Sequence, residues 1–188
     1  MSAPVGWIGV QGMDRERILE ATGLVETQPG KRLKASMWSL PNGWTLVLTV
    51  DFDFPTPERM AALSAEGRAV ALSADDRPMF SVVRGYERGK AVFTIEHDGG
   101  QQGVRHMETT GTLPAEWPAI LERLSKEQDE EDAGDNEVDF LFDAPLDLAK
   151  ALCGYRHDEV WPEGQEPDVT SLAEKKSPGL IGRLFGKG

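Results

Sequence analysis

Two aspartates and one histidine are the residues whose types could perform acid–base or metal chemistry. Asp51 and Asp53 alternate with apolar residues along a predicted strand, so their carboxylates are expected on one face about 6.5–7 Å apart. Such a pair could bind Mg²⁺ or Ca²⁺, or act as a general acid and base. Because two carboxylates are too few ligands for a dedicated metal site, we predict none and keep both residues as ligand-binding candidates.

His97 follows a predicted strand whose apolar side carries Phe93 and Ile95. The same alternation places His97 on that side, where it could act as a general base oriented by a carboxylate. The favoured interpretation is a histidine at the edge of the core that hydrogen-bonds to the backbone. His106 and His157 add no metal-binding spacing, so no zinc site is predicted.

Arg84 lies within a predicted apolar row. If Arg88-Gly89 forms a two-residue turn, Arg84 faces Phe93 on the next strand. A guanidinium in that position needs a carboxylate or a path to water. We favour a structural ion pair over an anion-binding site, and Arg84 is kept as a candidate for ligand binding.

Patterns for covalent catalysis or nucleotide binding are missing from the sequence. Ser73, Ser81 and Ser125 lack the Gly-x-Ser-x-Gly frame. Cys153 lies in a predicted apolar helix with no histidine at a fixed spacing, which favours a small buried side chain. The glycines of residues 99–103 lie between strands, unlike those of a P-loop or a dinucleotide turn. We therefore expect no catalytic residues and no cofactor.

Negative charge is concentrated in one segment. The chain has 20 Lys and Arg against 32 Asp and Glu, a net charge of −12. Nine of the acids and no base fall within residues 127–143, which we call the acidic run. Nucleic-acid binding is disfavoured because it depends on Lys and Arg, whereas a basic protein partner or a cation suits the run. The candidate partner-binding residues are Glu130, Glu131, Asp132, Asp135, Glu137 and Asp139. The alternative is a solvated linker between two helices.

Several protein classes are excluded by composition. The apolar stretch from Trp44 to Val50 is far shorter than the ~20 residues of a membrane span. A secretory signal begins with basic residues, and residues 1–10 contain none. A single cysteine cannot form a disulfide scaffold. We expect a cytoplasmic protein without stable membrane association. The apolar and basic residues 179–188 are expected to dock on protein rather than lipid.

The elements that must position these residues are visible as hydrophobic patterns. Period-two alternation and turn residues predict strands at 5–11, 44–54, 68–74, 79–87, 90–96 and 104–110. Capping residues and apolar stripes predict helices at 14–22, 57–65, from Pro114 to the start of the acidic run, and at 145–153. Consecutive strands followed by helices favour an α+β protein. We predict a mainly antiparallel sheet of five to seven strands with three to four helices on one face.

One hairpin register stays open. Asn42-Gly43 indicates a turn, and a two-residue turn pairs Trp38 with Val47 and places Trp38 on the outer face. A bulged turn would move Trp38 into the core. In the tight register the outer face of the sheet is partly apolar, and a second copy of the chain could cover it as a homodimer.

Residues 1–156 are predicted to form one domain and residues 157–188 a C-terminal tail, since the latter hold three prolines and little periodicity. The favoured function is a non-enzymatic, acidic interaction module of bacterial type that binds a basic partner. An immunity- or antitoxin-like inhibitor is its concrete version. The alternative is a small hydrolase or metal-dependent enzyme that uses Asp51, Asp53 and His97, which requires these residues to converge in one pocket.

Overall fold

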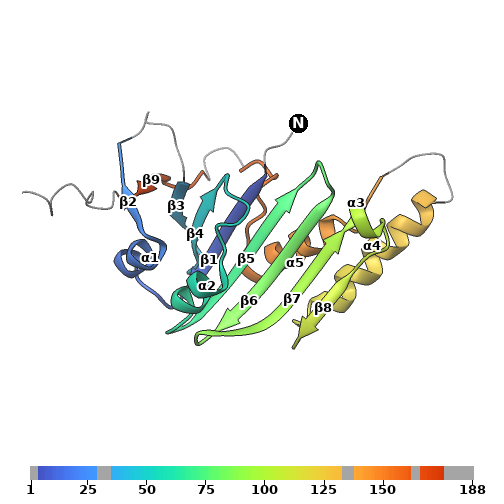
Figure 1. Cartoon of the computed structure of the whole chain (residues 1–188), viewed down its shortest axis with the longest axis horizontal. Coiled ribbons are helices and arrows are strands. Elements are labelled where there is room, and N and C mark those ends of the chain that lie inside the picture. Colours follow the sequence, from blue (N-terminus) through green and yellow to red (C-terminus); the bar gives the residue numbers. More distant parts are fainter. Residues whose placement is uncertain (1–3, 29–34, 133–137, 162–165, 176–188) are drawn as a thin grey trace, which may run out of the picture.

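A nine-stranded antiparallel sheet organises the part of the chain that our computed structural model describes, namely residues 4–28, 35–132, 138–161 and 166–175 (Figure 1). The strands are β1 (Val5–Gln11), β2 (Leu24–Glu26), β3 (Ala35–Ser39), β4 (Thr45–Thr49), β5 (Arg68–Asp75), β6 (Phe80–Glu87), β7 (Lys90–Asp98), β8 (Glu108–Gly111) and β9 (Thr170–Glu174). Their order across the sheet is β2-β9-β3-β4-β1-β5-β6-β7-β8. The predicted antiparallel α+β class is confirmed, and the nine strands and five helices of the described residues exceed the five to seven strands and three to four helices that the sequence predicted.

Helices cover both faces of the sheet. They are α1 (Arg15–Thr22), α2 (Pro57–Leu63), the short α3 (Gly99–Gln102), α4 (Trp117–Asp132) and α5 (Asp143–Cys153). Val70 and Leu72 of β5 belong to the core beneath α4 and α5, while Ala69 and Ala71 belong to the core beneath α1 and α2. The prediction of helices on one face was therefore wrong. The central strands carry apolar side chains on both faces of the sheet, and each face needs helices to cover it.

Capping residues begin α1 and α2 and end α1, and two of them, Gly23 and Thr56, were predicted. The Asp14 side chain accepts a hydrogen bond from the Arg17 N–H, and the Thr56 side chain accepts one from the Arg59 N–H. Gly23 ends α1 in the left-handed conformation, with φ 70°. Each of these caps depends on contacts within a few residues of the helix end, so it can be predicted without knowledge of the tertiary structure.

The β3–β4 hairpin adopts the bulged register. Met37 pairs with Val47 and Trp38 pairs with Leu46, and the loop closes through the Leu40 N–H and the Trp44 carbonyl, 2.7 Å apart. Trp38 is buried edge-on against Tyr155, with ring centroids 5.3 Å apart. Trp38 and Val47 are both covered within the chain, so neither provides the apolar outer surface that made a homodimer possible in the tight register.

The strand predicted over residues 44–54 ends at Thr49. The Asp51 N–H donates to Thr49 Oγ1 and the Asp53 N–H donates to Asp51 Oδ1, each at 3.0 Å. Side chains that capture the backbone in this way compete with the sheet and turn the chain. Asp51 and Asp53 therefore lie in a turn and not on the outer face of a strand, which corrects that prediction.

The segment assigned to a tail contributes a strand to the sheet. β9, residues Thr170–Glu174, lies between β2 and β3, and its Leu172 is fully buried. Its five residues are too short to stand out by periodicity in a stretch rich in proline and glycine. Residues 179–188, expected to dock on protein, lie outside the described residues. None of the described helices has the length and apolar character to cross a bilayer.

Candidate functional site

The three residues of the predicted enzyme site do not share a site. The turn that carries Asp51 crosses β1 on the α1 and α2 side, where its backbone lies against Gly6. His97 points to the opposite side of the sheet, into the α4 and α5 core. On its own side the turn extends over β5 and β6, where the Ser73 hydroxyl donates to the Phe52 carbonyl and the Phe52 and Phe80 rings meet edge-on, so the sheet itself lies between the two aspartates and His97. This geometry does not support the hydrolase or metal-dependent alternative.

His97 is the centre of a buried polar cluster, which we call the His97 junction. Its Nδ1 lies 2.8 Å from the His106 carbonyl and its Nε2 lies 2.9 Å from Asp139 Oδ2. The His97 side chain is fully buried, and only 6% of the Asp139 side chain is exposed. The junction therefore ties β7 to the segment between α4 and α5. The predicted core histidine bonded to backbone is confirmed.

Hydrogen bonding fixes the role of one ring nitrogen of His97. A carbonyl oxygen accepts only, so His97 Nδ1 must donate to the His106 carbonyl. The other ring nitrogen, Nε2, makes the hydrogen bond with Asp139 Oδ2. Asp139 Oδ1 also accepts from the Phe142 N–H at 3.1 Å, and the Asp98 N–H donates to Nδ1 of His106 at 2.9 Å.

Ser81 lies beside His97 across β6 and β7, so the junction has the composition of a catalytic triad. Its geometry is different, because Ser81 Oγ donates to the Phe142 carbonyl at 2.7 Å. Both His97 nitrogens are occupied by other partners, which leaves none to accept a proton from Ser81. Ser81 and His97 are also closed to solvent. The cluster therefore holds the fold and does not form a nucleophilic site.

Gly99 makes room for the junction. A Cβ atom at residue 99 would lie 2.1 Å from Asp139 Oδ2 and 2.8 Å from His97 Nε2. The position follows β7 directly and opens α3. Gly99 is therefore required for close approach and not only as part of the loop that the sequence predicted.

A buried amide side chain, that of Gln128, holds the end of α4. Gln128 Nε2 donates to Asp132 Oδ1 at 2.8 Å and to the Val138 carbonyl at 3.0 Å, and Gln128 Oε1 accepts from the Phe140 N–H at 2.8 Å. The side chain is almost fully buried. Gln128 thus bridges the helix to the residues on either side of Asp139.

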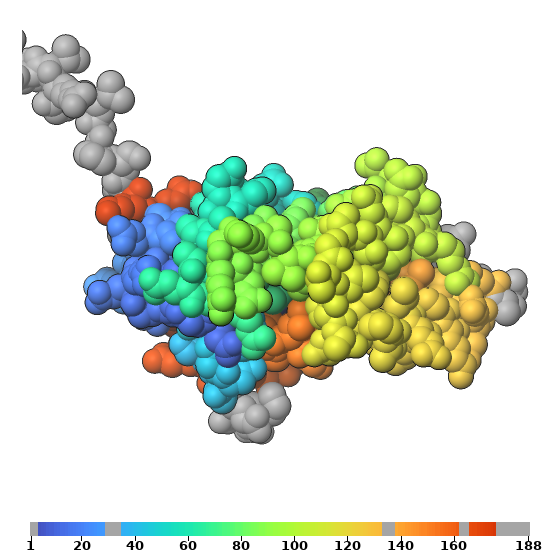
Figure 2. Space-filling view, turned by 90° about the horizontal axis from the view of Figure 1, so that it is seen from below, coloured from blue at the N-terminus to red at the C-terminus, as the bar shows by residue number. Residues whose placement is uncertain are grey.

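The acidic run is divided by the structure. Residues up to Asp132 extend α4, although the sequence predicted that the helix ends where the run begins. α4 lies at one end of the molecule, in gold in Figure 2. Asp129 and Glu130 are exposed, with side-chain exposures of 69% and 70%. Asp139 is buried in the His97 junction instead. Asp135 and Glu137 lie outside the described residues.

Arg105 reaches the end of α4 from the segment before β8. It pairs with Asp129 at 2.7 Å and also bonds Asp132. The pKa of Asp132 is lowered by the Gln128 hydrogen bond and then by Arg105. Glu130 lies 3.8 Å from Lys126. Glu131 is half-buried, and its Oε1 has no hydrogen-bond partner among the described residues. The described part of the acidic run is therefore partly neutralised within the chain, and Asp129 and Glu130 remain exposed.

The predicted surroundings of Arg84 were wrong. A bulge between Gly85 and Tyr86 shifts the register, so Arg84 pairs with Thr94 and not with Phe93. The residue lies on the α2 side of the sheet, partly exposed. No described carboxylate pairs with its guanidinium, so the structural ion pair that the sequence favoured is not seen. Arg84 and His97 point to opposite faces.

Other titratable groups form ion pairs or lie buried within the fold. Arg156 bonds three carboxylates, Asp143, Asp147 and Asp158, beside the C-terminal end of α5. Burial raises the pKa of the Asp143 carboxyl and raises the pKa of the Cys153 thiol to about 12, so this cysteine is a poor nucleophile. Across the described ranges, no three His, Cys, Asp or Glu side chains gather in a way that could hold a metal ion.

Sequence analysis missed Asp139 and Gln128 as partners in the polar core. A partial signal was present, because Asp139 and Asp143 are the two acids of the run with apolar neighbours on both sides. A carboxylate between apolar residues is a candidate for burial where it finds a partner. Comparisons of the sequence with models of protein families and with curated proteins, and of the structure with solved structures, find no match.

Proposed function

We propose that this protein is a non-enzymatic interaction module whose α4 end receives a basic surface of a partner protein. The supporting observation is four consecutive acids, Asp129 to Asp132, in the last turn of α4 with no base in that turn. The carbonyl end of a helix carries partial negative charge, so carboxylates are disfavoured there. Residues that oppose their local environment are typical of functional surfaces.

Internal pairing leaves charge available at this end. Arg105 contacts only Asp129 and Asp132 of the four acids. The most exposed carboxylate, Glu130, is 3.8 Å from a lysine that is itself 79% exposed, and an exposed pair of this kind contributes little. A basic partner would complement these carboxylates, which speeds encounter more than it adds affinity. An inhibitor that covers a basic enzyme is the concrete form of this function.

The test measures binding of the immobilised full chain to a panel of small basic proteins at low and high salt. We expect binding at low salt, weakened by high salt because exposed charges are screened. The double variant Asp129→Asn and Glu130→Gln should slow association about tenfold.

A matched control separates a local surface from net charge. Glu20→Gln with Asp76→Asn removes two exposed acids elsewhere and should leave association unchanged. Equal slowing by both double variants, binding that ignores salt, or no binding to any member of the panel would contradict the proposal.

A further inference from the structure

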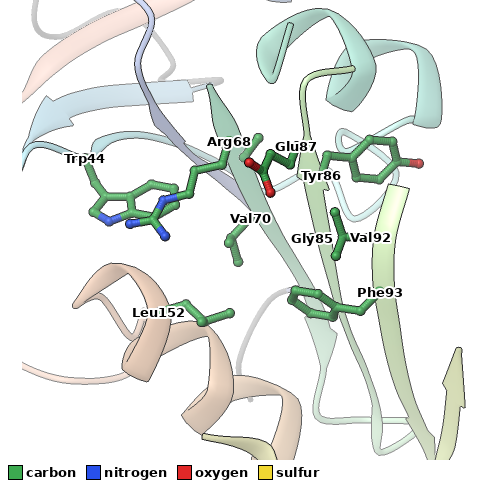
Figure 3. Close-up of a pocket in the computed structure, with 10 residues that line it drawn as sticks. Trp44, Arg68, Val70, Gly85, Tyr86, Glu87, Val92, Phe93 and Leu152 are labelled. Carbon is green, nitrogen blue, oxygen red and sulfur yellow. The ribbon is translucent and has the colours of Figure 1, made fainter. Parts of the chain in front are cut away.

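A small hollow lies between the start of β5, the β6–β7 hairpin and the last turn of α5 (Figure 3). It has a volume of about 140 Å³ and an apolar lining that includes Trp44, Val70, Phe93 and Leu152. A cavity of this size accepts one aromatic ring or branched aliphatic group. The hollow is open to solvent and distinct from the acidic end of α4.

The bulge between β6 and β7, where Val92 of β7 is the extra residue, helps to form the hollow. A Cβ at Gly85 would lie 2.0 Å from the Phe93 ring, so this ring lies directly over the glycine. The register shift follows between Gly85 and Tyr86. Bulges re-aim side chains and are frequent beside binding sites.

Arg68 is fixed at the mouth of the hollow. Its guanidinium carbon lies 4.9 Å from the centroid of the Trp44 ring, and its Nε donates to Gln11 Oε1 at 2.8 Å. The cross-strand neighbour of Arg68 is Glu87, yet no described residue forms an ion pair with this arginine. Its two terminal nitrogens are thus held in place and free to bind a carboxylate in bidentate fashion.

More positive charge surrounds the neighbouring surface. Arg88 and Lys90 line a shallow depression that shares Glu87 and Val92 with the hollow. Within the described ranges neither base has an ion-pair partner, in contrast to Arg15 with Glu26 or Arg17 with Glu66. Glu87 is the one carboxylate among the residues that line the two depressions. Three bases against this one acid leave a net positive local surface in a chain of net charge −12.

We propose that this hollow docks an acidic segment of a partner protein that inserts one aromatic or branched aliphatic side chain. The inserted side chain would contact Phe93, Val70 and Leu152, and a neighbouring carboxylate would bind Arg68. Further acids would be attracted by Arg88 and Lys90. Charge complementarity selects an acidic occupant, and the volume limits it to one large side chain. The inference does not depend on the function proposed for α4, because the two surfaces have opposite charge.

The test is an amide NMR titration of the full chain with a capped pentapeptide of two aspartates, one phenylalanine and two aspartates. We expect saturable shifts at the Trp44 indole N–H and at the amides of Gly85, Val92 and Leu152. Peptides with alanine for phenylalanine, or lysines for the aspartates, should bind at least tenfold more weakly. Absence of shifts at these positions would overturn the proposal.

Two variants and a free ligand complete the test. Arg68→Gln should weaken peptide binding about tenfold, while the control Arg17→Gln, another exposed arginine, should not change it. Leu152→Phe, which fills the hollow, should also weaken binding while Arg68 is intact. If phenylacetate binds as tightly as the peptide, the hollow is a small-molecule site and the docking proposal is wrong.

Discussion

Glu130 and Asp139 belong to the same acidic run, yet their environments are opposite. The Glu130 side chain is mostly exposed, whereas Asp139 is buried and bonded to both His97 and the Phe142 N–H. Coulombic interactions are weak in water and strong in a buried site. Charge counted along a sequence therefore combines two different roles, and burial and hydrogen-bond partners separate them.

Gln128 lies at the boundary between these two regions. It bonds Asp132 on the exposed side and the backbone of Val138 and Phe140 on the buried side. The exposed end of α4 is therefore positioned by the same polar core that buries Asp139. Variants on either side of Gln128 should separate stability from surface charge.

The largest effect is expected for Asp139→Ala. It leaves His97 Nε2 and the Phe142 N–H without their partner in a buried site, and removing one member of a buried pair costs about 3–5 kcal/mol. Urea denaturation monitored by tryptophan fluorescence measures the loss. The control Glu130→Ala should leave the unfolding midpoint unchanged. If both variants unfold at the same urea concentration, the two carboxylates do not differ as we describe.

Gln128→Ala is expected to have the next largest effect. The change removes three hydrogen bonds and leaves the Val138 carbonyl and the Phe140 N–H unpaired, which costs about 2–3 kcal/mol. Thermal unfolding of this variant, with Gln102→Ala on exposed α3 as control, measures the difference. An unchanged melting temperature would show that Gln128 does not connect the two regions.

Ser81→Ala should have a smaller effect on the buried side. It removes the hydrogen bond to the Phe142 carbonyl and costs about 1 kcal/mol. The matched change Ser125→Ala, at a partly buried serine of α4, should cost less. A loss as large as that of Asp139→Ala would mean that Ser81 and not the carboxylate holds this segment against β6.

Local patterns predicted much of this fold, and long-range pairing supplied the rest. The bounds of β1 match the predicted strand at residues 5–11, and the predicted caps at Gly23 and Thr56 are confirmed. These features depend on neighbours within a few residues. β9 could not be found in this way, because its place between β2 and β3 depends on residues far away in the sequence.

The candidate sites show the same division. His97 was correctly placed on the apolar side of β7, but its partner Asp139 is 42 residues away in sequence. The prediction for Arg84 was wrong because the bulge at Val92 shifts the pairing of β6 with β7 by one residue. A shift by one residue places a side chain opposite the other face of the neighbouring strand. Spacing along a strand predicts the face on which a side chain lies. It does not predict which distant side chain lies opposite.

The smallest expected effect is on the exposed side, at Asp132. Its pKa is lowered by the Gln128 hydrogen bond and by Arg105, so the stability that it contributes is present above its unfolded pKa and is lost as pH falls through the lower folded pKa. Carboxyl ¹³C NMR should therefore show Asp132 titrating below the ordinary range. Arg105→Gln should raise this pKa in part while leaving the melting temperature at neutral pH almost unchanged, because exposed pairs contribute little. A melting temperature that falls as far as that of Asp139→Ala would remove the distinction between the buried junction and the exposed helix end.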